Sequence, residues 1–243
     1  MKKITIVSLI ILTLFSCEKQ KNETLIEEKK SLIIESTETI TETEIVFPKT
    51  GKKSKDFLPK SNTYEIQYET KGDLNNDNLI DVAIVLRNLK DKTAERPILI
   101  LLQNDDRTFS LAKLSTIAMP EEFSDDNFKN YDSESIEIED EVLQINLYGS
   151  GGLVGNLFSH YKFIENEMVL IYIETYNVGA GSWQNLYYDL QKGELIEEIT
   201  NTMSEDMTTK DKTFKVNKEH HLFDNAVPND IIFNTLNSSE SNW

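Results

Sequence analysis

The sequence has 243 residues and carries 42 Asp and Glu against 25 Lys and Arg, a formal net charge of -17 at pH 7. This length suits one domain of ordinary to large size, with room for a second small one. The negative charge argues against nucleic acid and against direct adsorption to anionic lipid, because both repel an acidic protein. It favours solubility and the binding of cations.

The first sixteen residues have the composition of a secretory signal peptide. Two lysines precede a mostly apolar run at 4–15, which is too short to be a membrane-spanning helix. The sequence Leu-Phe-Ser-Cys at 14–17 resembles a bacterial lipobox, and Cys17 is the only cysteine of the chain. A plain signal peptide with an incidental thiol is the alternative.

The lipobox resemblance implies that residues 1–16 are removed and that Cys17 becomes the acylated N-terminus of an exported lipoprotein. Several acyl chains hold a protein stably on a membrane, since each buried methylene contributes about 0.8 kcal/mol. We therefore expect a membrane-anchored protein of the bacterial cell envelope, on the periplasmic or the surface face of the outer membrane. With no second cysteine, an intramolecular disulfide is excluded.

Residues 17–55 are rich in Glu, Lys and Thr, and we expect a disordered tether that holds a folded body off the membrane. A short helix over 27–34 is the alternative, although isolated helices of this length are marginal in water.

Strand signals begin soon after residue 56, and we predict a β domain over 56–200. Apolar and polar residues alternate from Tyr64 to Tyr68 and again over 108–114, while 82–86 and 97–102 are continuous apolar runs. Such spacing is typical of an antiparallel meander with short turns.

After an acidic loop at 115–131, three further hairpins are expected. They pair 135–138 with 142–147, 157–164 with 168–173, and 185–190 with 194–199, through turns at 139–141, 165–167 and 191–193. No helical period of useful length follows Phe57, so we predict an all-β fold, an antiparallel meander, sandwich or partial barrel of about ten strands. Residues 201–243 form a polar C-terminal extension, and whether it packs on the β domain is left open.

The most informative stretch connects the first two predicted strands. Oxygen-bearing side chains occupy the first, third, fifth and ninth places of this loop, at Asp73, Asn75, Asp77 and Asp81, and Leu79 is able to add its backbone carbonyl. Such donors suit calcium, which prefers six to eight oxygen ligands. The alternative is a polar turn that binds nothing, since Asn and Asp favour turns on their own account.

The loop and the strand after it, 72–85, resemble the calcium loop of integrin-type FG-GAP and VCBS repeats, and 98–109 resembles the second half of that repeat. The resemblance implies a structural calcium ion in a bacterial lipoprotein with a single such repeat. Two departures matter. Asn78 stands where the family usually has Gly, and one loop is too few for a propeller.

No group of residues is arranged for a reaction, so we expect a lipoprotein whose calcium-stabilised β domain binds a protein or glycan partner without catalysis. Trp183, in a glycine-rich loop, is able to stack on a sugar or a peptide, although it suits a core cap as well. One alternative is a hydrolase of envelope polymers that uses loop carboxylates, such as those at 121–122 and 125–126. Another is an inhibitor or immunity lipoprotein.

Overall fold

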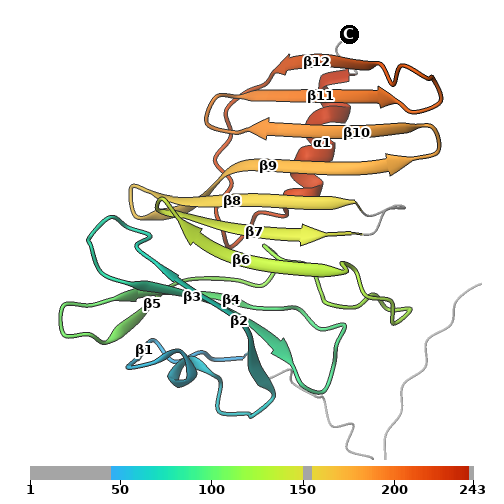
Figure 1. Cartoon of the computed structure of the whole chain (residues 1–243). Helices are drawn as coiled ribbons and strands as arrows, with labels where there is room; N and C mark the ends of the chain where they lie inside the picture. Colours follow the sequence, from blue (N-terminus) through green and yellow to red (C-terminus); the bar gives the residue numbers. More distant parts are fainter. Residues whose placement is uncertain (1–44, 150–154, 241–243) are drawn as a thin grey trace, which may run out of the picture. The chain divides into compact units, whose positions relative to one another are not determined.

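The computed structural model describes residues 45–149 and 155–240, which form two antiparallel β-sheets and one α-helix (Figure 1). The five-stranded sheet has the order β1-β5-β4-β3-β2, with β1 Thr50–Gly51, β2 Tyr64–Gly72, β3 Asp81–Asn88, β4 Ile98–Gln103 and β5 Phe109–Ser115. The seven-stranded sheet runs β12 to β6 in reverse chain order, with β6 Ser133–Glu139, β7 Val142–Tyr148, β8 Asn156–Ile164, β9 Glu167–Gly179, β10 Ser182–Asp189, β11 Glu194–Asn201 and β12 Thr209–Lys215. A 3-10 turn, Ser54–Phe57, follows β1.

The predicted all-β fold is confirmed, and the three hairpins have the expected partners. Two of their turns have positive φ at both central residues, Asp140 with Glu141 and Glu165 with Asn166. Turns of this kind match the right-handed twist of the flanking strands, so they set the register of β6 against β7 and of β8 against β9.

Strand β3 lies between β4 and β2 in the five-stranded sheet and is buried on both faces. Ala83 and Val85 face a core shared with the seven-stranded sheet, whereas Val82, Ile84 and Leu86 face a smaller core. Phe47, Phe57 and Tyr64 belong to that second core, and Phe47 lies within the stretch 17–55 predicted as a tether. Burial on two faces explains why the sequence of β3 is continuously apolar rather than alternating.

The C-terminal extension contains β12 and the helix α1, Pro228–Glu240. The expectation of no helix after Phe57 is therefore wrong. Pro228 suits the first turn of a helix, and Pro228, Ile232 and Leu236 are buried at a spacing of one turn. The stripe is narrow and lies among polar residues, so its period is weak in the sequence. Packing on the inner face of the curved seven-stranded sheet stabilises this helix (Figure 1).

A buried ion pair joins the two sheets. Arg96, just before β4, donates to both carboxylate oxygens of Glu134 in β6 at 2.7 and 3.0 Å, and to the carbonyl oxygen of Pro120 at 2.7 Å. The two side chains are 1% and 0% exposed. The Tyr68 hydroxyl also donates to Glu134, at 3.0 Å. Four residues further along the same two strands, Gly72 in β2 lies so close to Ile138 in β6 that an added Cβ would sit 2.4 Å from its Cγ2.

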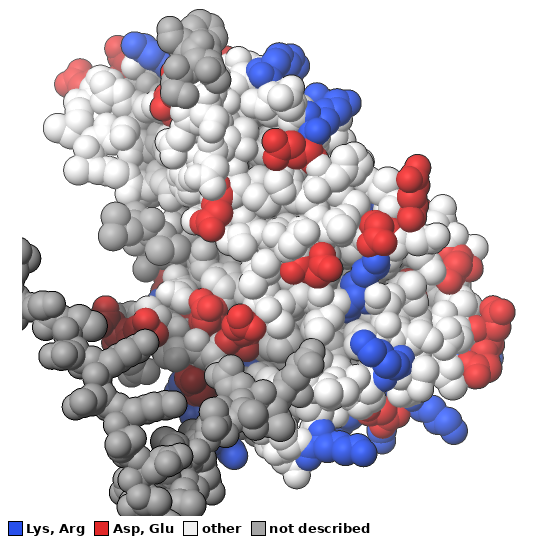
Figure 2. Space-filling view, turned by 180° about the vertical axis from the view of Figure 1, so that it is seen from behind, with Lys and Arg blue, Asp and Glu red and all other residues white. Residues whose placement is uncertain are grey.

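The predicted signal peptide, Cys17 and most of the predicted tether lie outside the described residues. Within the described ranges, no helix combines the length and apolarity needed to cross a membrane. On the back face, acidic and basic side chains are interspersed (Figure 2).

Candidate functional site

The predicted cation loop connects β2 to β3, and its last ligand is built into the sheet. Asp81 is fully buried at the start of β3, where its two oxygens accept the N–H groups of Leu74 and Gln103, each at 2.9 Å. Burial raises the pKa of Asp81, the two N–H groups lower it, and the charges of Asp77 and Asp73 raise it further. The three carboxylates therefore interact, although only Asp81 is held in the core.

The other side chains of the loop hold its backbone in place. Asp73 accepts the N–H groups of Asp77 at 3.2 Å and of Asn78 at 2.8 Å, and Asp77 accepts the N–H of Leu79 at 2.7 Å. Asn75 donates its amide to Asp77 at 2.9 Å. Asn78 has φ 65°, a left-handed conformation that Asn adopts more readily than most residues, so it serves where the repeat family usually has Gly.

Asp73, Asn75, Asp77, Leu79 and Asp81 thus lie in one short loop, and their carboxylate, amide and carbonyl oxygens are the donors that calcium prefers. Each carboxylate oxygen that accepts one N–H group retains a lone pair. Across the described ranges, however, no three His, Cys, Asp or Glu side chains are gathered closely enough to hold a metal ion. The types of donor in the loop thus suit calcium, whereas its carboxylates are not gathered around one centre in this structure.

A second feature is an aromatic surface on the outer face of the seven-stranded sheet, away from α1. Strand alternation and register place one set of rings together there. The set, hereafter the aromatic face, consists of Tyr148, Phe158, His160, Tyr172, Tyr176, Trp183 and Tyr187. Its rings meet pairwise across neighbouring strands: Tyr148 with Phe158 at 5.2 Å, His160 with Tyr172 at 5.1 Å, and Tyr176 with Trp183 at 6.5 Å between centroids.

Carboxylates are interleaved with these rings. Tyr172 donates its hydroxyl to Glu174 at 3.0 Å, and Tyr187 donates to Glu198 at 3.3 Å. Burial, followed by these neighbouring carboxylates, raises the pKa of both tyrosines, so their hydroxyls stay protonated and donate. Within the described ranges, neither Glu174 nor Glu198 forms an ion pair with Lys, Arg or His. Trp183, the ring singled out from the sequence, lies at one end of this face and is 37% exposed.

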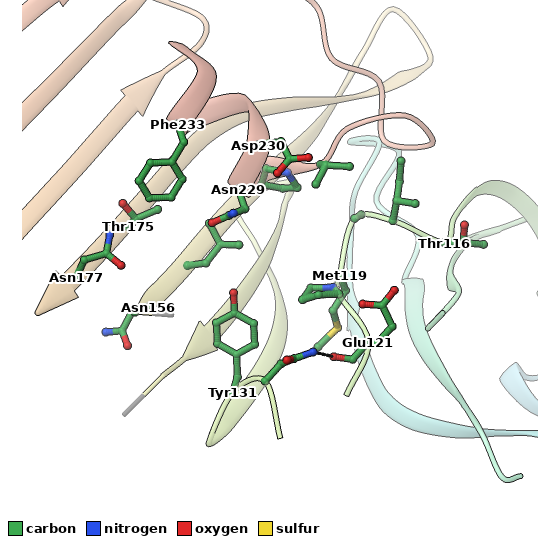
Figure 3. Close-up of a pocket in the computed structure, with 18 residues that line it drawn as sticks. Thr116, Met119, Glu121, Tyr131, Asn156, Thr175, Asn177, Asn229, Asp230 and Phe233 are labelled. Atoms are coloured by element: carbon green, nitrogen blue, oxygen red, sulfur yellow. Dashed lines mark hydrogen bonds between the residues drawn. The ribbon is translucent and has the colours of Figure 1, made fainter. Parts of the chain in front are cut away.

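A third feature is a pocket of about 420 Å³ between the sheet, the loop before β6 and the start of α1. Figure 3 shows Phe233, Thr175 and Asn177 on one side of it, Met119 and Glu121 on the other, and Tyr131 and Asn229 between them. The lining comes from the loop before β6, from β8 and β9, and from the start of α1, which lie far apart in the sequence, so no local sequence pattern indicates the pocket. Of the loop carboxylates named as possible catalysts, Glu121 lines this pocket, whereas Glu122 lines a smaller hollow beside Arg96.

The chain was compared with protein-family models, with curated proteins and with solved structures, and none of them matches significantly.

Proposed function

We propose that this protein is an envelope lipoprotein whose β domain binds a glycan, without catalysis, on the aromatic face. The observation that carries the proposal is the row of rings across β7 to β10, which are exposed or half-buried on the side of the sheet opposite α1. Aromatic rings pack well against the apolar C–H face of a sugar, and polar groups between them fix its orientation.

The polar groups of the face favour a glycan over a protein partner. Glu174 stands directly opposite both Phe158 and Tyr187 in the sheet register, and Asn185 stands opposite Tyr176. Phe158, Tyr176 and Tyr187 thus each have a carboxylate or an amide oxygen opposite them, and hydroxyl groups of a sugar are donors for such oxygens. A neutral, hydroxyl-rich ligand meets no charge repulsion from the acidic chain.

Replacing Trp183 or Tyr176 by Ala is expected to weaken binding of a soluble envelope polysaccharide about five- to tenfold, because one stacking ring is worth roughly 1 kcal/mol. Affinity electrophoresis of the full chain in detergent measures this. Phe128→Ala is the matched control, since Phe128 is a 73% exposed aromatic residue outside the face. Equal affinities for parent, Trp183→Ala and Phe128→Ala would remove the aromatic face from the proposal. If the protein bound no polysaccharide but retained a protein from the envelope fraction, the partner would be a protein and not a glycan.

The anchor belongs to the same proposal. Cys17 is expected to carry lipid, which would place the β domain at the outer membrane as a tethered receptor. Cys17→Ser is expected to abolish incorporation of labelled palmitate and to move the protein from the membrane fraction to the soluble fraction. Labelled palmitate in the Cys17→Ser variant would show that the anchor is not at this residue.

One observation favours a hydrolase as a second candidate. Glu121 and Asp230 both line the pocket, and glycoside hydrolysis uses two carboxyl groups on either side of a bound sugar. Release of reducing ends from an oligosaccharide, lost in Glu121→Gln, would favour this activity over simple binding.

A further inference from the structure

The pocket at the start of α1 contains polar groups that have no hydrogen-bond partner among the described residues. Thr175 in β9 is 2% exposed, and its hydroxyl has no hydrogen-bond partner within the described ranges. The side chain lies on the inner face of the sheet and lines the pocket (Figure 3). A buried hydroxyl without a partner is costly, so a ligand group in the pocket that pairs with this hydroxyl would remove that cost.

The start of α1 leaves further donors at the same pocket. The first helical bond runs from the N–H of Ile231 to the carbonyl of Val227, which makes Val227 the N-cap residue. Val227 has no side-chain oxygen, and the described residues supply no other acceptor for the N–H groups of Asn229 and Asp230. These three residues all line the pocket. The end of a 13-residue helix therefore offers free N–H groups where Thr175 offers a free hydroxyl.

The lining restricts the charge of a ligand. It contains no Lys, Arg or His, and its charged residues are Glu121 and Asp230, which would repel an anion. A cation is disfavoured in turn by the positive end of the helix dipole. Apolar groups, among them Met119, Leu157 and Phe233, alternate with the amides of Asn156 and Asn177 around the space. A neutral molecule with both hydroxyl or carbonyl oxygens and an apolar face satisfies this lining.

We propose that this pocket binds one neutral saccharide unit, with an oxygen of the sugar accepting from the first turn of α1 and another group pairing with the Thr175 hydroxyl. The volume of about 420 Å³ lies within the range of small-ligand sites. This site uses the inner side of the sheet, and it rests on residues that the aromatic face does not include.

The test is calorimetric titration of the full chain in detergent with single neutral sugars, glucose, galactose and N-acetylglucosamine. Thr175→Val removes the hydroxyl and keeps the shape, and it is expected to weaken binding about tenfold, the effect of one lost hydrogen bond. Because none of the described residues pairs with the hydroxyl, the melting temperature of this variant is expected to stay the same or rise. Thr213→Val, at an exposed position of β12, is the matched control.

Val227→Ser gives an independent reading. A serine at the N-cap accepts a backbone N–H of the first turn, so it is expected to stabilise the helix and to weaken sugar binding together. A ligand-independent structural role would instead leave affinity unchanged in both variants.

Loss of affinity in Thr175→Val and Val227→Ser, with stability maintained, supports the site. No binding of any of the three sugars by the parent at up to about 50 mM would overturn it, since that bound corresponds to almost no net affinity. If Trp183→Ala weakened the binding of single sugars and Thr175→Val did not, the proposed pocket site would be wrong, and the aromatic face would be the sugar site. Failure of polysaccharide binding, with single sugars still bound, would instead refute only the aromatic face.

Discussion

Replacement of Glu134 by Leu lowers the free energy of unfolding by about 3 to 5 kcal/mol, because it leaves the buried guanidinium of Arg96 without its carboxylate. The pair is almost inaccessible to water and joins the two sheets. Arg96→Met has an effect of similar size, since it strands the charge of Glu134. Urea denaturation of the purified variants measures both.

The double variant Arg96→Met with Glu134→Leu recovers much of this loss, because two apolar side chains of similar volume leave no buried charge. Glu65→Leu is the matched control: its ion pair with Arg87 is 46% and 41% exposed, so its removal costs at most about 1 kcal/mol. If Glu134→Leu lowered the free energy of unfolding as little as the control does, the buried pair would not be critical for joining the sheets.

The pKa of Tyr68 provides a second test of the same cluster. Burial, followed by the charge of Glu134, raises the pKa of Tyr68 to about 12. A raised tyrosine pKa stabilises the fold below the ordinary value near 10, and this contribution is lost as the pH rises toward 12. Glu134→Leu is therefore expected to lower the pKa of Tyr68, which ultraviolet titration of the tyrosines follows.

We also expect two carboxylates of the proposed calcium loop to respond in different ways to substitution. Asp81→Ala lowers the free energy of unfolding by about 2 to 4 kcal/mol even without calcium, because the N–H groups of Leu74 and Gln103 lose their acceptor. Asp77 is exposed, and Asp77→Ala costs much less in the absence of the ion. The effect of Asp81→Ala therefore measures folding and does not test for a metal.

The test for calcium is the ligand dependence of the parent and of Asp77→Ala. At a concentration ten times the Kd, calcium is expected to add about 1.4 kcal/mol to the stability of the parent, a rise of about 3 to 6 °C in Tm, and to have little effect on the variant. Asp105→Ala, in another exposed turn, is the control. A parent whose Tm is unchanged at several millimolar calcium, where a site of this class is filled, would leave the loop as a polar turn.

The pH dependence of the loop has a defined sign. Burial, partly offset by two N–H groups, raises the pKa of Asp81, so the folded state without calcium favours the neutral carboxyl. Stability that arises from this preference is lost as the pH rises through the folded pKa. As the pH falls, the free energy of unfolding of the parent is therefore expected to rise relative to that of Asp81→Asn. Bound calcium is expected to oppose this trend because it favours the charged form of the carboxyl group.

The sequence by itself determined strands β2 to β11, the turns between their hairpins and the class of fold, whereas β1 and β12 were not predicted. Alternation at 64–68, the continuous run at 82–86 and the short polar turns at 139–141 and 165–167 are local signals, because side-chain period and turn conformation depend on residues close in sequence. The loop at 73–81 was visible for the same reason, since its donors lie within nine consecutive positions.

Tertiary structure alone decided the helix α1, the Arg96–Glu134 pair, the aromatic face and the pocket. The helix depends on packing against the sheet, since its sequence is mostly polar. The ion pair, the face and the pocket each bring together residues from separate strands and loops, and sequence spacing carries no information about which strands become neighbours across a sheet or between two sheets. The sequence around Arg96 and around Thr175 shows no distinctive pattern. Only the folded protein shows that Arg96 forms a buried ion pair and that Thr175 lines the pocket.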